Sequence, residues 1–320
     1  MDLKNISKKT IQFILIVITV SFLSSIFGSA NNLAGVSIIT AFLIFKELGI
    51  GLNRRTASVI ILLAFPFIGI ITHFMQSLMW LGFIANIITM IIILVFSGPS
   101  YHNKGYIPFV LTFIFLQGNP VQGADWYLRI TELSLGGLLL STVYFLKHKN
   151  DEEQMTLKEH INTLKINPQI MGFIMRMSIG IPFAILMGIA LNTPKVMWIS
   201  IVIMSLTQIT KESMHNRIKN RVLASFIGVI LFVCVIEMFI PTKLYSITLL
   251  ILGFIYSFFD EYKYQQIITT MSVLTVSVAV LGSETTILAR LSMLGFGIII
   301  VTMLHEIQII WQNSKNSFVA

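Results

Sequence analysis

Apolar residues along this chain form long runs that are separated by short polar segments. A helix needs about 20 mostly apolar residues to cross a bilayer, so the pattern predicts an all-α polytopic membrane protein with about twelve transmembrane helices. The predicted helices cover residues 11–28, 33–46, 56–75, 78–97, 106–117, 126–146, 170–191, 195–210, 220–240, 243–259, 265–282 and 286–308. The second, fifth and eighth runs are short, so fewer full crossings with re-entrant segments are an alternative.

Composition supports a lipid environment. Hydrophobic residues make up 55% of the chain and charged residues 11%, whereas a soluble domain carries roughly 25% charged residues. The net charge of +8 raises the question of nucleic-acid binding. However, the basic residues gather in short loops between apolar runs, and no basic stripe with interleaved aromatic residues occurs. We therefore expect the lipid bilayer, and no nucleic acid, as a partner.

The positions of the basic residues predict an orientation. If the N-terminus is cytoplasmic, 17 of the 22 lysines and arginines fall on the cytoplasmic side, as the positive-inside rule requires. Lys195 and Lys243 fall in external loops, and Arg129, Arg176 and Arg290 lie within spans or at their ends. The distribution predicts a multi-pass protein of a bacterial inner membrane with both termini in the cytoplasm.

The two halves of the chain correspond at an offset of about 161 residues. The clearest match aligns Arg129 and Gly136 with Arg290 and Gly297, because each arginine precedes its glycine by seven positions. Six spans in each half would make two parallel repeats, related by a pseudo-twofold axis along the membrane normal. The expected domains are a first six-helix repeat over 1–146, a cytoplasmic linker over 147–168 and a second six-helix repeat over 169–320.

Several short motifs point to a known family. They are Trp198 in a short span, Arg217 and Arg221 in the following loop, Gly228 in the next span, and the run Arg129, Glu132 and Gly136. With six spans in each half, they resemble the fusaric acid resistance and aromatic acid exporter superfamily. The resemblance implies an inner-membrane efflux permease for small organic, often aromatic, acids, commonly assumed to be driven by protons. Val36 stands where a second Trp would be, and Met293 replaces the second Glu.

The charges inside predicted spans are the first candidate site residues, because a buried charge is costly unless it is paired or hydrated. Arg129 and Glu132 lie three positions apart on one helical face and can form an ion pair. They would attract an anion, with Glu132 carrying a coupled proton; alternatively, they form a structural pair near the outer surface. Arg290 has no glutamate at the equivalent position, which suits anion binding. Arg176 either faces the substrate or extends to the cytoplasmic headgroups.

The basic loops form a second group of candidates. Arg54, Arg55, Arg217 and Arg221 are expected to anchor the topology by contacting anionic lipid. The alternative is a cytoplasmic ring that collects anions, which the matching positions in the two repeats would allow.

No catalytic motif is present. The sequence has one cysteine and no P-loop, HExxH or Gly-x-Ser-x-Gly pattern, so we expect no enzyme activity, no metal and no cofactor. The leading hypothesis is a permease that exports small organic anions, with a periplasmic adaptor protein or a second copy of the chain as partners. The alternatives are a membrane scaffold or assembly subunit and a short transporter of the major facilitator type, although the loop after the second span lacks that family's usual motif.

Overall fold

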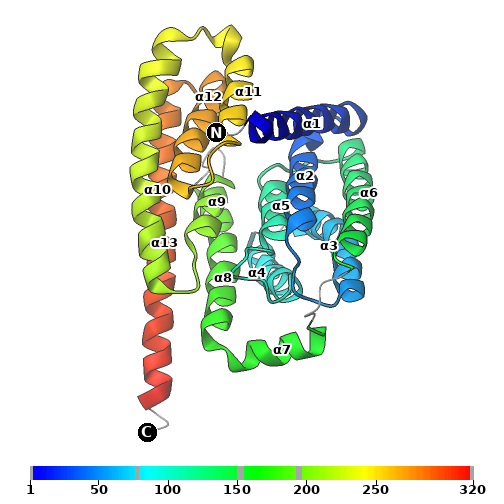
Figure 1. Ribbon diagram of the computed structural model, residues 1–320. Helices are drawn as coiled ribbons and strands as arrows, with labels where there is room; N and C mark the ends of the chain where they lie inside the picture. Colours follow the sequence, from blue (N-terminus) through cyan, green and yellow to red (C-terminus); the bar gives the residue numbers. More distant parts are fainter. Residues whose placement is uncertain (1–2, 76–78, 150–154, 192–196, 318–320) are drawn as a thin grey trace. The chain divides into compact units, whose positions relative to one another are not determined.

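The computed structural model describes residues 3–75, 79–149, 155–191 and 197–317, and this part of the chain is almost entirely helical (Figure 1). The α-helices are α1 (Leu3–Phe27), α2 (Asn32–Glu47), α3 (Arg54–Met75), α4 (Met79–Phe96), α5 (Ile107–Gln117), α6 (Ala124–Lys147), α7 (Leu157–Ile166), α8 (Pro168–Ala190), α9 (Met197–Leu206), α10 (Lys211–Leu231), α11 (Tyr245–Tyr256), α12 (Tyr262–Leu281) and α13 (Ser283–Ser317). Shorter elements are the 3₁₀ turns η1 (Ser29–Asn31) and η3 (Thr242–Leu244) and the π-helical segment η2 (Phe232–Glu237).

Seven helical segments in the described residues are long and apolar enough to cross a membrane. They are Ile6–Phe27, Ser29–Glu47, Arg54–Met75, Ala124–Lys147, Pro168–Ala190, Lys211–Glu237 and Ser283–Trp311. Shorter apolar helices cover Trp80–Phe96, Ile107–Gln117, Met197–Leu206 and Thr242–Tyr256. The chain is therefore an all-α, multi-pass membrane protein, as the hydropathy pattern predicts. The count of twelve crossings and their arrangement in two parallel repeats stay predictions.

The charged segment between the predicted halves contains α7. This helix begins with a capping box, in which the Thr156 hydroxyl accepts from the Glu159 N–H and the Glu159 carboxylate accepts from the Thr156 N–H. Its buried residues are His160 and Leu164, four positions apart on one face. The next helix, α8, begins at Pro168, and Asn167 caps it by accepting two backbone N–H groups. Local capping chemistry thus separates a short amphipathic helix from a long apolar one.

Packing divides the chain into two compact units. Unit 1 comprises the described residues of Met1–Ile18 and Lys211–Ile299, and unit 2 those of Thr19–Thr210 and Ile300–Ala320. The division falls within α1 and α13, so each of these helices contributes to both units. These units follow backbone packing, which is a different property from the duplication predicted from the sequence.

Unit 1 is built on α10, α11 and α12, and α12 packs against both of the others. Its apolar core contains Phe232, Ile236, Tyr245, Leu252, Ile268, Met271 and Leu274. Gly228 lets α10 approach α12 closely, because a Cβ at this position would lie 2.9 Å from the carbonyl oxygen of Ile267. A small residue at such a crossing replaces side-chain bulk with close backbone packing.

Unit 2 contains α2 to α9. In it α3 packs against α6, α2 packs against α5 and α6, and α4 packs against α8 (Figure 1). Gly137 on α6 faces α3, where a Cβ would lie 3.0 Å from the carbonyl oxygen of Leu62. The close α3–α6 contact therefore depends on this glycine in the same way as the α10–α12 contact depends on Gly228.

Candidate anion-binding site

A cluster of three arginines and one tyrosine forms in unit 1. Arg217 and Arg221 lie four positions apart on α10, so their side chains project from the same face of this helix. Tyr262 is the first residue of α12, which packs against α10. Arg290 comes from α13. We call these four residues the arginine–tyrosine cluster.

Tyr262 is the centre of the arginine–tyrosine cluster. The guanidinium of Arg217 lies over its ring, 3.7 Å from the centroid, which is a cation–π contact. Arg221 donates from Nη1 to the Tyr262 hydroxyl at 3.2 Å. The side chain of Arg290 lies close enough to both Arg221 and Tyr262 to interact with them electrostatically. Residues from three helices therefore converge on one phenol ring.

The cluster concentrates positive charge in a buried place. Arg221 is 2% exposed and Arg290 is 5% exposed. Guanidinium groups repel one another at short range, and the repulsion grows where water is excluded. An anion that binds between Arg221 and Arg290 would offset this repulsion, and the planar guanidinium matches a carboxylate with two parallel hydrogen bonds. The arrangement is suited to binding a small organic anion.

The residues of this cluster belong to separate elements in the hydropathy pattern. Arg217 and Arg221 fall in a predicted cytoplasmic loop, Arg290 falls in the last predicted span, and Tyr262 is not a predicted site residue. In the structure Arg217 and Arg221 lie within α10, so their predicted position in a loop is wrong. They share one site with Arg290 and Tyr262. Hydropathy gives the order of the spans along the chain, but it does not show where long side chains from different helices meet.

Arg129 is held within unit 2 by three hydrogen bonds. Its Nε donates to Asn31 Oδ1 at 2.9 Å, Nη1 donates to the carbonyl of Asn119 at 2.7 Å, and Nη2 donates to the carbonyl of Ala30 at 3.0 Å. Arg129 is 3% exposed, so its side chain is enclosed by the protein. Its bonds join α6 to the turn before α2 and to the segment that follows α5.

Glu132 lies one helical turn from Arg129 on α6, and no direct hydrogen bond joins the two described side chains. In the described part of the chain, the guanidinium of Arg129 is directed to Asn31 and to two carbonyls instead. The two side chains attract each other electrostatically, but the hydrogen bonds of the guanidinium go to these other acceptors and not to the carboxylate. The Oε2 atom of Glu132 is buried and has no hydrogen-bond partner, while Oε1 lies against the backbone of Gly35 on α2. Glu132 is thus a buried carboxyl group whose Oε2 atom accepts no hydrogen bond.

Arg176 on α8 is buried too. It donates from Nη1 to Gln308 Oε1 and from Nη2 to the carbonyl of Gln208 at 2.6 Å. Gln208 lies in the segment between α9 and α10, and the neighbouring carbonyl of Ile209 accepts from the same Nη2 at 3.3 Å. The arginine therefore ties α8 to the segment after α9 and to α13, and at 4% exposed its side chain is enclosed by the protein.

The other predicted basic residues, Arg54 and Arg55, begin α3 in unit 2. The guanidinium of Arg54 lies 4.3 Å from the centroid of the Phe145 ring, and the side chain of Arg55 is exposed. Lys243 is exposed in unit 1, and Lys195 lies outside the described residues. In the part of the chain that the structure describes, no group of three His, Cys, Asp or Glu side chains could hold a metal ion.

The fold and the site define a multi-pass helical membrane protein with a buried basic cluster. A family model described as "Fusaric acid resistance protein-like" matches residues 183–304. The resemblance expected from the short motifs is thereby confirmed for this part of the chain, which includes the whole arginine–tyrosine cluster. No curated protein and no solved structure matches the chain.

Proposed function

We propose that this protein is a permease that exports small organic anions, aromatic carboxylates among them, across a bacterial inner membrane. The family match and the long apolar helices fit a membrane transporter in general. The anionic substrate is supported by one observation, which is the convergence of Arg217, Arg221 and Arg290 on Tyr262. In this proposal Arg221 and Arg290 bind the carboxylate, and the planar guanidinium groups also offer a surface on which an aromatic ring can stack.

The proposal includes the twelve crossings in two parallel repeats with both termini in the cytoplasm. It gives Arg129 and Arg176 a positioning role, because their guanidinium groups bind carbonyls and amide side chains of the protein. Glu132 is the carboxyl that takes up and releases a coupled proton. Its support is the buried Oε2 atom, which can be protonated without the loss of an existing hydrogen bond. A periplasmic adaptor and a homodimer are the proposed protein partners.

The transport proposal is tested in proteoliposomes with a panel of aromatic and aliphatic carboxylates and an imposed pH gradient. We expect Arg221→Gln and Arg290→Gln each to lower the initial rate for the best substrate by about tenfold or more, since a charged hydrogen bond is worth about 1.5–3 kcal/mol. Lys243→Gln removes one exposed charge from the same unit and should transport like the wild type. If no carboxylate in the panel is transported by the wild type, the permease proposal is wrong and the scaffold alternative gains support.

Proton coupling is tested separately with Glu132→Gln. This change keeps the shape of the side chain but removes the titratable group. We expect transport to lose its dependence on the pH gradient, while downhill exchange of the anion continues. Glu237→Gln changes an exposed glutamate and serves as the matched control. Unchanged dependence on the pH gradient in Glu132→Gln would remove Glu132 from the coupling mechanism.

A further inference from the structure

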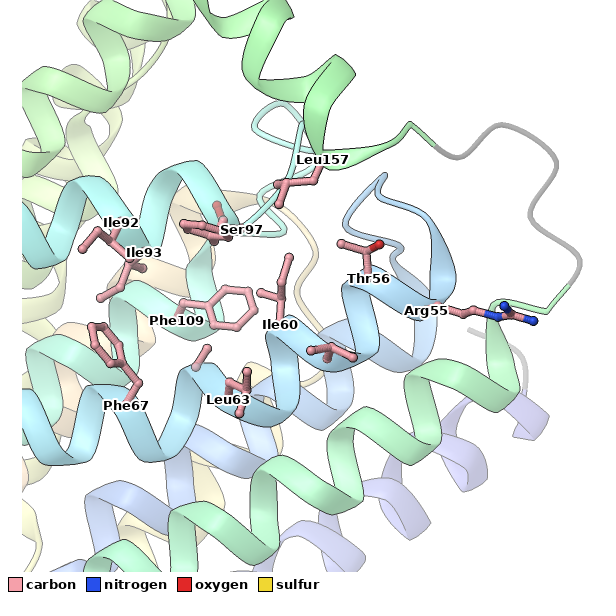
Figure 2. A pocket seen from close by; sticks show the side chains of 13 residues that line it. Arg55, Thr56, Ile60, Leu63, Phe67, Ile92, Ile93, Ser97, Phe109 and Leu157 are labelled. Carbon is pink, nitrogen blue, oxygen red and sulfur yellow. The ribbon is translucent and has the colours of Figure 1, made fainter.

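An apolar groove of 610 Å³ lies between α3 and α4 in unit 2 (Figure 2). Its walls come from α3 and the end of α4, and Phe109 of α5, which is 1% exposed, lies at its base. Arg55, Thr56 and Ser97 are its polar lining residues, and the others are apolar. The volume lies within the range of about 300–1,000 Å³ that is typical of small-molecule sites.

The start of α7 lies at one end of the groove. The segment before α3 pairs with the segment before α7 through two backbone hydrogen bonds, from Asn53 N–H to the carbonyl of Met155 at 2.9 Å and from Met155 N–H to the carbonyl of Gly51 at 3.2 Å. This pairing sets Leu157 at the end of the groove, where it contributes to the lining. The first turns of α3 and α7 are therefore held together.

A second link fixes α7 to the opposite wall. His160 donates from Nε2 to the carbonyl of Val95 at 3.0 Å, near the end of α4. The Leu157 end of the groove is thus built from three segments that are distant in the sequence and bonded to one another. It is a formed site rather than a gap between two helices.

One cation, Arg55, lies at this same end. Arg55 lines the groove, and its guanidinium points away from the apolar lining in Figure 2. At the start of α7, Lys158 and Glu159 are both exposed and carry opposite charges, so Arg55 is the charged residue that lines the groove. The groove is therefore amphiphilic, with one cation at one end and mostly apolar side chains along the rest.

The apolar walls face outward. Val59 and Leu63 are 54% and 60% exposed, and they belong to α3, a candidate membrane span. Apolar side chains exposed on a spanning helix contact lipid tails, and basic residues at the end of such a helix attract anionic headgroups. We propose that the groove binds one acyl chain of an anionic phospholipid, with its headgroup at Arg55. The proposal is independent of the transport function, because it concerns unit 2 and a lipid rather than the transported anion.

Native mass spectrometry of the delipidated protein tests this proposal, with dioleoyl phosphatidylglycerol and dioleoyl phosphatidylcholine as the two probes. We expect the wild type to retain phosphatidylglycerol in preference to phosphatidylcholine. Arg55→Gln should weaken phosphatidylglycerol binding about fivefold and leave phosphatidylcholine unchanged, since one cation near an anionic lipid surface has an effect of this size. Lys149→Gln, a charge change at an exposed position outside the groove, should keep the preference.

A second variant tests the acyl-chain part of the site. Ala64→Trp places a large side chain inside the groove and should reduce the retention of both lipids about tenfold, because the chain loses its cavity. Leu139→Trp adds a tryptophan at an exposed apolar position of α6 and should retain lipid like the wild type. Size-exclusion profiles of all variants check folding. Equal retention of the two lipids by the wild type, or full retention by Ala64→Trp, would overturn the proposal.

Discussion

Arg129 should contribute more to the stability of unit 2 than any exposed cation, because its side chain joins three segments. In Arg129→Met the apolar volume is partly kept, while all three hydrogen bonds are lost. The carbonyl of Ala30 keeps a second partner, since Asn119 Nδ2 donates to it at 2.9 Å. Asn31 Oδ1 and the carbonyl of Asn119 lose the donor that Arg129 supplies. The perturbation therefore leaves one buried acceptor, Asn31 Oδ1, and one half-buried acceptor, the carbonyl of Asn119, short of a hydrogen bond.

The expected loss follows from these two acceptors. A buried acceptor without a partner costs about 1–3 kcal/mol and a half-buried one costs less, so the unfolding free energy of unit 2 should fall by roughly 2–4 kcal/mol. For a unit of this size, 1 kcal/mol corresponds to about 2–4 °C in the unfolding midpoint. We expect Arg129→Met to lower the midpoint by about 10 °C in detergent, measured by the loss of the monodisperse size-exclusion peak after heating.

Lys149→Met removes an exposed cation from the same unit, and its midpoint should stay within about 2 °C of the wild type, as for most surface substitutions. If Arg129→Met unfolded at the same temperature as Lys149→Met, its hydrogen bonds would not stabilise the fold. The positioning role assigned to Arg129 would then be refuted.

Three further predictions concern other polar contacts and one glycine. Gly98 has a φ of +82°, and a Cβ there would collide with the carbonyl of Ile50. Gly98→Ala should therefore lower the unfolding free energy by about 1–3 kcal/mol, seen as a lower unfolding midpoint in detergent. Burial holds the pKa of His160 below its usual value of 6.5, although its bond to the carbonyl of Val95 opposes the shift. Because the pKa of His160 is lower in the folded state, its contribution to stability is complete above pH 6.5 and is lost as the pH falls through the folded pKa. Between pH 8 and 5 the thermal midpoint should therefore fall less in His160→Gln than in the wild type. Arg176→Met should increase protease cleavage after α9, because the carbonyls there lose their donor, and unchanged cleavage would contradict this role.

The helix positions could be predicted from the sequence because hydropathy is a local property. The predicted run at 33–46 corresponds to α2 (Asn32–Glu47), and the run at 126–146 corresponds to α6 (Ala124–Lys147). The boundary of α7 also has a local signal, the capping pair Thr156 and Glu159, although hydropathy alone leaves this segment as a linker. What composition and periodicity can show is therefore the order of the elements and their type.

The partners of the buried arginines could not be predicted in this way. The sequence offers Glu132 to Arg129 because the two lie one turn apart, but the acceptor that binds Nε belongs to Asn31, 98 positions away. Arg176 similarly reaches Gln308, 132 positions away. These contacts depend on which helices pack together, and a single sequence does not contain that information. The contact between Arg221 and Tyr262 in the proposed anion site joins residues 41 positions apart and could not be predicted for the same reason.

The most direct test of the central claim is anion binding by the arginine–tyrosine cluster itself. Isothermal titration of the purified protein in detergent would use the carboxylate that the wild type transports fastest. We expect Arg221→Gln and Arg290→Gln each to raise the Kd for this carboxylate about tenfold or more. Lys243→Gln should bind it like the wild type. Wild-type affinity in folded Arg221→Gln and Arg290→Gln would show that the anion binds elsewhere and would contradict the proposed site.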